Sequence, residues 1–403
     1  MYPAQTAEQP VAADPDAFGP GLYVHIPFCA RKCFYCDFTA YFHRDERAER
    51  YVSDLLAEIK LAAAALAARQ QEAGQAEAIS FRTVFFGGGT PSILTASQLS
   101  RIFDRLHACF SIPAAAEFTL EANPGTLTPD RLEAMRRGGA NRLSIGAQAR
   151  QPHLLAALGR DHGWDDVEAG AAAARAAGFD NFNIDLMFGL PGQSMADWQE
   201  SLAAAAALEP AHVSSYGLEV EPHTSYGRWQ REGRLRLPPD DLQRGMMEVM
   251  IERLAARGFE HYEISNFARP GRRSRHNLNY WANGDYLGLG AGAWSHWQGA
   301  RWGNLRYLKR YHEAVAAGVR PVDEVDEPDQ RTRKAEAVIL GTRLVEGMPR
   351  SWFYRRFDED VTDIFGPELA RLTDRGWLSV DDDRIALTAE GRLLANEVWM
   401  TFL

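Results

Sequence analysis

The segment Tyr23-Val-His-Ile-Pro-Phe-Cys29-Ala-Arg-Lys-Cys33-Phe-Tyr-Cys36-Asp-Phe38 decides how this sequence is interpreted. It places Cys29, Cys33 and Cys36 in one C-x3-C-x2-C loop directly after a β-type run at residues 22–26. Three thiolates at this spacing can bind three corners of a cubane 4Fe–4S cluster and leave the fourth iron open to an external ligand. Cysteines so close together would strain a disulfide, which favours a reduced, intracellular metal site.

A structural zinc ion is the alternative interpretation of this loop. Such a site closes with four ligands, and the fourth would have to be His25, Asp37 or the distant Cys109. Cys109 follows Ile102 and Leu106 at helical spacing, which indicates a core position. The missing fourth ligand therefore favours the cluster.

Short β-type runs alternate with helical patterns between residues 20 and 220, which predicts an α/β fold with a parallel sheet. Right-handed crossovers bring the carboxyl ends of such strands to one edge, where binding sites collect. The runs are 22–26, 83–86, 117–121, 142–145, 183–187 and 213–218, and the helical patterns include 47–69, 96–110, 165–177 and 195–208.

Four regions are predicted along the chain. They are a loose tail at 1–20, the main α/β region at 21–239, an extension of it at 240–325, and a small winged-helix-like α+β domain at 326–403. The extension is predicted to contain a helix at 242–257 and a strand at 259–264. The last domain is predicted to have helices at 331–344, 366–374 and 389–399 and a hairpin formed by 377–381 and 384–387.

The composition of the chain bears on which partners it can bind and in which compartment it is found. The chain has 403 residues and a net charge of −10, which argues against non-specific binding to nucleic acid. No apolar run approaches the ~20 residues that span a bilayer, and residues 1–20 lack the basic start and apolar core of a signal peptide. We therefore expect a cytoplasmic protein whose contact with a membrane is at most peripheral; a homodimer is compatible with the sequence.

Polar residues stand at or near the ends of the later strands. Glu121 ends the third run, and Asp185 lies within the fifth. A carboxylate inside a buried strand is costly without a partner. Glu121 and Asp185 are therefore candidates for binding a ligand, and pairing with Arg142 or Arg160 is the alternative. Arg160 could equally pair with a carboxylate of a ligand.

The cysteine loop, the Gly87-Gly88-Gly89-Thr90-Pro91 segment after the second strand and the six-unit order together resemble the radical S-adenosylmethionine (SAM) superfamily. The resemblance implies a partial (β/α)6 barrel and a 4Fe–4S cluster that passes one electron to bound SAM. Glycines let a backbone approach a ligand closely and adopt positive φ. The alternative for the glycine triplet is a tight strand-to-helix turn.

The motifs Tyr23-Val-His-Ile-Pro-Phe-Cys29, Glu121-Ala-Asn-Pro-Gly and Asp185-Leu-Met-Phe-Gly-Leu-Pro-Gly-Gln are similar to the oxygen-independent coproporphyrinogen III oxidase group. This resemblance implies that Tyr23, Gly88 and Glu121 contact the SAM on the cluster. The positions that it implies around the cofactors, including a second SAM, are Tyr35, Gly89, Thr90, Gln148, Arg160 and Asp185.

Two features differ from the oxidase. Phe38 stands where the oxidase motif has a further cysteine, and His276-Asn277-Leu278-Asn279-Tyr280-Trp281 matches the H-N-x-x-Y-W signature of the HemW group of heme chaperones. The resemblance implies that His276, Asn277, Tyr280 and Trp281 bind heme as a third cofactor. It also implies delivery of heme to apoproteins such as membrane respiratory enzymes.

The chemistry of the signature agrees with heme, because neutral imidazole is a good iron ligand. Four nearby arginines could pair with propionates; they are Arg269, Arg272, Arg273 and Arg275. The alternative is a polar loop that anchors the extension against the barrel. For the whole protein, the alternatives are a coproporphyrinogen oxidase and a related radical methyltransferase or heme-degrading protein.

Overall fold

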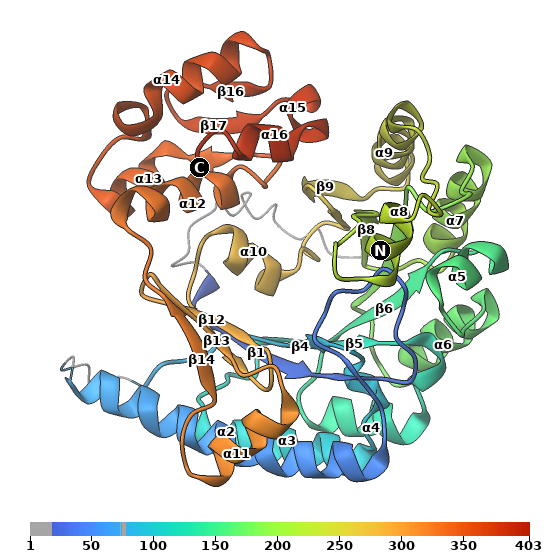
Figure 1. Ribbon diagram of the computed structural model, residues 1–403, viewed down its shortest axis with the longest axis vertical. Coiled ribbons are helices and arrows are strands. Elements are labelled where there is room, and N and C mark those ends of the chain that lie inside the picture. Colours follow the sequence, from blue (N-terminus) through green and yellow to red (C-terminus); the bar gives the residue numbers. More distant parts are fainter. Residues whose placement is uncertain (1–17, 73, 75–77) are drawn as a thin grey trace, which may run out of the picture.

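A computed structural model describes residues 18–403 except 73 and 75–77. Six parallel strands form the middle of a twelve-stranded sheet, in the order β1-β4-β5-β6-β7-β8 (Figure 1). They are β1 (Gly21–Ile26), β4 (Thr83–Gly88), β5 (Glu117–Ala122), β6 (Arg142–Gln148), β7 (Phe182–Phe188) and β8 (His212–Gly217). Each predicted strand of the main region is present. The sheet is curved but does not close, as expected of a partial barrel.

Helices follow these strands and cover the outer face of the curved sheet (Figure 1). They are α2 (Asp45–Glu72), α3 (Ala96–Cys109), α4 (Pro129–Arg137), α5 (Pro152–Leu158), α6 (Trp164–Ala176) and α7 (Met195–Ala207). Two short 3-10 helices, η1 (Pro91–Ile93) and η2 (Pro124–Thr126), precede α3 and α4. Cys109 is half-buried against the main core, which confirms its predicted core position.

The two faces of the sheet have different chemistry because strand side chains alternate. The apolar set, including Val24, Phe86 and Leu120, belongs to the main core. On the opposite face lie polar side chains such as Asn183 and His212, which hydrogen-bond to each other. The inner wall of the barrel is therefore polar and suited to a ligand.

The extension adds strands to both edges of the same sheet. β11 (Tyr286–Leu289) runs parallel to β1 and leads outward to β12 (Trp294–Trp297), β13 (Ala300–Asn304) and β14 (Val322–Asp326). β10 (Asn266–Ala268) and β9 (Glu260–Glu263) lie beyond β8. The helix α8 (Ser225–Arg231) lies before this part, whose own helices are α9 (Asp240–Ala256), α10 (Arg275–Trp281) and α11 (Leu308–Ala316). The sheet thus crosses the predicted boundary at residue 240, and the division into domains stays a prediction.

The C-terminal part has its own core and a three-stranded sheet in the order β15-β17-β16. Its elements are α12 (Gln330–Gly341), β15 (Met348–Pro349), α13 (Arg350–Phe357), α14 (Val361–Asp374), β16 (Leu378–Val380), β17 (Arg384–Leu387), α15 (Ala389–Leu393) and α16 (Ala395–Trp399). The prediction of one final helix was wrong, because the backbone at Leu394 (φ −117°, ψ 27°) breaks it in two.

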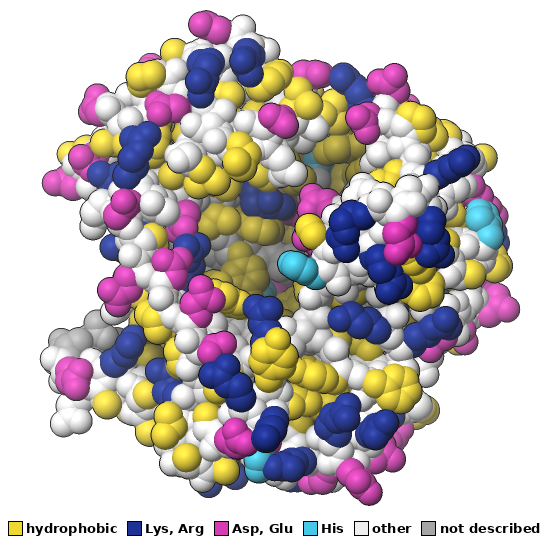
Figure 2. All heavy atoms as spheres, viewed as in Figure 1, with side chains coloured by type: hydrophobic (Ala, Val, Ile, Leu, Met, Phe, Trp, Pro, Cys, Tyr) yellow, Lys and Arg dark blue, Asp and Glu magenta, His cyan; other side chains and the backbone are white. Residues whose placement is uncertain are grey.

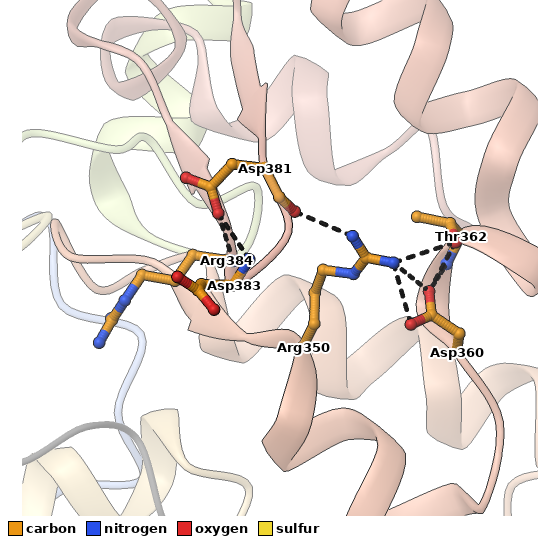
Figure 3. A network of polar contacts seen from close by, with 6 residues as sticks. All are labelled: Arg350, Asp360, Thr362, Asp381, Asp383 and Arg384. Carbon is orange, nitrogen blue, oxygen red and sulfur yellow. Dashed lines mark hydrogen bonds and ion pairs between the residues drawn. The ribbon is translucent and has the colours of Figure 1, made fainter.

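Arg350 joins three elements of this C-terminal part (Figure 3). One of its nitrogens donates to both oxygens of Asp360 at 3.0 Å, and another donates to the carbonyl of Asp381 at 2.9 Å. Asp381 in turn accepts from the backbone N–H groups of Asp383 and Arg384. Hydrogen bonds between charged groups are stronger than neutral ones, so this contact holds α13 against the start of α14 and the β16–β17 turn.

Two expectations concern the termini and the membrane. Residues 1–17 of the predicted tail lie outside the described residues, and Phe18 is buried in a small apolar cluster with Tyr262 and Leu278. No helix in the described part of the chain is long and apolar enough to cross a membrane.

Candidate cofactor and heme sites

The three predicted cluster ligands lie in one loop after β1, and all three thiols are half-buried. A short ladder fixes the start of this loop: β2 (Phe28–Cys29) pairs with β3 (Tyr41–Phe42), and the amide of His43 donates to the carbonyl of Cys29 at 2.9 Å. Burial raises the pKa of Cys36 to about 11, and the charges of Cys33 and Cys29 add to the increase. The three thiols are therefore within electrostatic reach of one another.

The glycine segment after β4 holds the cysteine loop in place. The amides of Gly89 and Thr90 donate to the carbonyls of Ile26 and Phe28 at 2.9 and 2.7 Å. A Cβ at Gly89 would lie 2.6 Å from the Phe28 oxygen, and one at Gly88 (φ +107°) would lie 2.5 Å from the His25 ring. The loop's own packing thus requires these two glycines.

His25 braces the cysteine loop, a role that the sequence analysis missed. Its ring is buried; Nε2 donates to the carbonyl of Thr39 at 2.9 Å, and Nδ1 accepts from the hydroxyl of Tyr23 at 3.0 Å. Both ring nitrogens are engaged, so His25 is not free to complete a zinc site. Among the described residues, no group of three or more His, Cys, Asp or Glu side chains could hold a single metal ion.

The donors around the thiols fit a cluster held by anionic thiolates. The Thr90 hydroxyl lies 3.7 Å from the Cys29 sulfur, and the Arg160 guanidinium lies 3.7 Å from the Cys33 sulfur. A nearby cation and hydrogen-bond donors favour the ionised form of a thiol, which is the form that binds metal. Cys29, Cys33 and Cys36 are therefore a chemically suitable set for a 4Fe–4S cluster.

Arg160 also connects the loop to the carboxyl ends of β5 and β6. It donates to the side-chain oxygen of Asn123 at 2.5 Å and to the carbonyl of Gly146 at 2.6 Å. Gln148 ends β6 after a bulge with φ +66°, beside the same guanidinium. The structure thus brings the predicted Arg160 and Gln148 together and adds Asn123, which the sequence analysis overlooked.

Neither Glu121 nor Asp185 forms an ion pair with Arg142 or Arg160 among the described residues, although Arg142 is close enough for its charge to lower the pKa of Asp185. Asp185 instead accepts from Ser144 and Asn183 at 3.1 and 2.7 Å. Burial, together with the smaller effect of the charge of Asp185, raises the pKa of Glu121 to about 8. Burial also raises the pKa of Asp185. Two buried carboxyls that form no ion pair with Arg142 or Arg160 are suited to receive a cationic group.

Tyr35 faces the same region. Burial raises the pKa of its hydroxyl, and the charges of Cys33, Cys36 and Asp185 add to the effect. The predicted cofactor residues therefore converge at one end of the barrel, around the cysteine loop.

The H-N-x-x-Y-W segment forms α10, a helix rather than the loop considered from sequence. The Ser274 hydroxyl accepts from the amide of Asn277 and caps the helix. Glu117 on β5 accepts from the amides of Arg275 and His276 at 3.0 and 2.9 Å. The carboxylate of Glu117 thereby holds the start of α10 against the amino-terminal end of the barrel.

His276 is fully buried, and both of its ring nitrogens are engaged. Nδ1 lies 2.8 Å from the hydroxyl of Thr83, and Nε2 lies 2.8 Å from the hydroxyl of Tyr280. The ring stacks on Phe85 with 5.1 Å between centroids. Burial lowers the pKa of His276 to about 3, and the charge of Arg142 adds to the decrease. The imidazole is therefore neutral, but iron could reach it only if one hydrogen bond opened.

The remaining signature residues and the arginines before them contact protein groups. Trp281 lies under the guanidinium of Arg343 at 4.2 Å. The predicted propionate partners are separately occupied: Arg269 stacks on Phe259, Arg272 pairs with Asp180, Arg273 pairs with Glu260 and Glu346, and Arg275 donates to the carbonyl of Ala115.

A cavity of about 780 Å³ lies beside α10, at the end of the barrel away from the cysteine loop. Gly19 and Pro20 before β1 line it, together with the segment Asn283–Asp285 that follows α10. The C-terminal part supplies Arg333, Lys334 and Arg356 to the opposite wall. The neighbouring Gly21 packs against His276, where a Cβ would lie 3.0 Å from the ring.

Comparisons with known proteins agree with this architecture. Residues 23–205 match the Radical SAM superfamily and residues 329–394 match the HemN C-terminal domain. The solved structure of the coproporphyrinogen III oxidase HemN from Escherichia coli superimposes with a TM-score of 0.80 at 26% identity, covering 95% of this chain and 90% of that one. The fold and the cysteine site thus define a radical SAM protein with a HemN-type C-terminal domain, a class that implies a 4Fe–4S cluster and SAM.

Relatives with a curated description identify the family within the radical SAM class. The heme chaperone HemW of Bacillus subtilis is 36% identical over 94% of this chain and 98% of its own length, and that of Escherichia coli is 35% identical over 95% and 97%. The chain belongs to this HemW family.

Proposed function

We propose that the protein is a heme chaperone, which binds heme and delivers it to apoproteins such as membrane respiratory enzymes. The observation that carries the proposal is the near full-length relation to the HemW proteins, which includes the C-terminal part beside α10. An oxygen-independent coproporphyrinogen oxidase is the second candidate, supported by the similarity to HemN.

In this proposal, Cys29, Cys33 and Cys36 hold the cluster and Arg160 stabilises their charge. The cluster supplies one electron to SAM when both are bound. Glu121 and Asp185 receive the positively charged end of SAM, and Tyr23, Tyr35, Gly88, Gly89, Thr90 and Gln148 complete its surroundings. The polar inner wall of the barrel takes the place of the water that the charged groups of SAM would otherwise bind.

Heme is proposed to bind at α10 and to extend into the neighbouring cavity. A heme carries two propionates, and Arg333 and Arg356 on the cavity wall are cations of the kind that carboxylates prefer, whereas Lys334 on the same wall pairs with Glu359. His276 becomes the iron ligand when its hydrogen bond to Tyr280 opens, because its low pKa leaves the ring neutral. Asn277 and Trp281 would flank the macrocycle.

The test is a heme titration of the anaerobically reconstituted protein, followed by its Soret band. We expect saturable binding in the unmodified chain and in His153→Ala, a control at an exposed histidine at the start of α5. His276→Ala should abolish binding and leave the cluster absorbance unchanged. Tyr280→Phe should retain binding, because it frees Nε2 from its hydrogen bond.

Three outcomes would count against the proposal. If no variant binds heme specifically, the carrier function fails, and conversion of coproporphyrinogen III with SAM would support the oxidase. If His276→Ala loses the cluster as well, His276 is structural. If heme binds with an unchanged spectrum in His276→Ala, another residue holds the iron.

A further inference from the structure

Two buried hydrogen-bond donors on neighbouring strands of the barrel have no partner. Arg142 begins β6, and its register partner on β5 is Thr119. Arg142 is 2% exposed and Thr119 is fully buried. Among the described residues, Nε of Arg142 and Oγ1 of Thr119 form no hydrogen bond, and Arg142 forms no ion pair. Buried polar groups are nearly always hydrogen-bonded, so this pair of donors requires an explanation.

Both side chains face the interior of the barrel. Side chains alternate along a strand, so Arg142 lies on the same face as Ser144, which donates to Asp185 at 3.1 Å. The charge of Arg142 lowers the pKa of Asp185 on the inner wall and that of His276 on α10. The guanidinium therefore lies within electrostatic reach of both.

The carboxyls of the inner wall do not pair with this guanidinium. Glu117 accepts from two amides at the start of α10. Asp185 accepts from Ser144 and Asn183, and Glu121, whose pKa is about 8, is protonated at neutral pH. A buried cation without a paired anion is costly, which favours an anionic group that arrives with a ligand.

The position of the two donors favours a carboxylate of a porphyrin over the carboxylate of SAM. Arg142 and Gln148 are the two ends of β6, about 20 Å apart at roughly 3.3 Å per residue. Arg160 and the cysteine loop lie at the Gln148 end, whereas His276 lies near Arg142. Figure 2 shows a hollow where Figure 1 places α10, and hydrophobic atoms line its floor. An apolar floor near a buried cation suits a macrocycle that carries propionates.

We propose that Arg142 and Thr119 form a carboxylate site inside the barrel that binds a propionate of heme. The guanidinium of Arg142 donates to the carboxylate, and the hydroxyl of Thr119 donates a further hydrogen bond. No covalent bond forms or breaks. The inference rests on the proposed heme binding and deepens it, because it names the groups that recognise a propionate.

The experiment compares heme with its dimethyl ester, which keeps the iron and the macrocycle but lacks both carboxylates. Each is titrated into the reconstituted holoprotein, and the Soret band is followed. Arg142→Met removes the cation and keeps a long side chain, and Thr119→Val replaces the hydroxyl by a methyl group. The matched control is Arg137→Met on α4, where the arginine side chain is 80% exposed. The affinity for SAM is measured by calorimetry on the same proteins.

We expect the unmodified chain and Arg137→Met to bind heme about tenfold or more tightly than the ester, because hydrogen bonds to charged groups are strong. Arg142→Met should lose this preference, and Thr119→Val should lose part of it. Neither variant should bind the ester or SAM less tightly than the unmodified chain does.

Several results would contradict the propionate site. Equal affinity of the unmodified chain for heme and the ester would overturn the inference and leave the carrier function in place. An unchanged preference for heme in Arg142→Met would also overturn it. Weaker binding of SAM in that variant, with the preference for heme kept, would assign the site to the carboxylate of SAM instead. If the unmodified chain binds neither porphyrin, the carrier function fails and the inference fails with it.

Urea unfolding of the apoprotein detects a purely structural role of the guanidinium. Arg142→Met should be at least as stable as the unmodified chain, because it removes a buried cation that has no paired anion. Arg350→Met should be less stable, because it breaks the pair with Asp360. A loss of stability in Arg142→Met as large as that in Arg350→Met would show that Arg142 supports the fold and would overturn its assignment to a ligand.

Discussion

At the scale of single residues, the carboxyl of Glu121 shows how a ligand site changes the response of stability to pH. Its pKa rises to about 8 in the folded chain, against an ordinary value of 4.5. The folded state therefore binds more protons than the unfolded state between these values, and its free energy of unfolding decreases as pH rises through that window. We expect Glu121→Gln to remove this decrease, so that the variant gains stability relative to the unmodified apoprotein toward alkaline pH.

Urea unfolding of the apoprotein across that pH window checks this expectation. Glu133→Gln on α4 serves as the control, because the Glu133 side chain is 71% exposed. A stability difference between Glu121→Gln and the unmodified chain that does not change with pH would show that Glu121 has an ordinary pKa in the folded state.

Residue identities also set how far the site could be predicted. The cysteines, Glu121 and Asp185 were recognisable because thiols at fixed spacing and carboxyls in apolar strands are unusual for a core. His25 and Asn123 were not, because each acts through a contact with a segment distant in sequence: Thr39 for His25 and Arg160 for Asn123. The residues next to His25 and Asn123 in the sequence do not indicate these contacts.

At the scale of elements, α10 depends on its amino-terminal cap. The buried Ser274 hydroxyl accepts from the amide of Asn277. Removing a serine cap costs about 1 kcal/mol, so Ser274→Ala should lower the free energy of unfolding by about that amount. Thr128→Ala at the start of α4 is the comparison, since the Thr128 hydroxyl donates to the exposed Asp130 but makes no cap bond. Equal losses in the two variants, measured by urea unfolding, would contradict the assigned role of Ser274.

The six parallel strands could be predicted from the sequence, whereas the helix α10 could not. The six parallel strands have apolar residues facing the helices, and such buried runs are visible in sequence. The short α10 has only seven residues, so its periodicity is weak, and its cap and Glu117 contacts decide its structure. The four arginines before it could not be placed either, because a turn at Gly271 (φ +72°) sends neighbouring side chains to different partners.

At the scale of the whole molecule, Arg343 joins the C-terminal part to the barrel. Its guanidinium lies 4.2 Å from the Trp281 ring and 4.9 Å from the Trp399 ring. Its charge also lowers the pKa of the buried Glu263, whose burial raises that pKa to about 6. Arg343→Ala should therefore destabilise the protein by about 1–3 kcal/mol, since it removes the stacking and leaves a buried carboxyl without its cation.

Amide hydrogen exchange shows whether Arg343 couples the C-terminal part to the barrel or only stabilises its own surroundings. Arg343→Ala should increase exchange in both α10 and α12, whereas Arg375→Ala, which removes a guanidinium stacked on Trp377 within the C-terminal part, should leave α10 unchanged. Protection of α10 that is equal in the two variants would mean that Arg343 does not couple the two parts.

The order of strands also has a consequence for synthesis on the ribosome. β1 lies between β4 and β11, so its second edge stays unpaired until about residue 289 has left the exit tunnel. The edge of β8 likewise waits for β10. A nascent chain with all six parallel strands thus exposes two sheet edges, which are templates for aggregation. A ribosome that pauses between residues 217 and 286 would prolong this exposure, so rapid translation of that stretch protects the yield of folded protein.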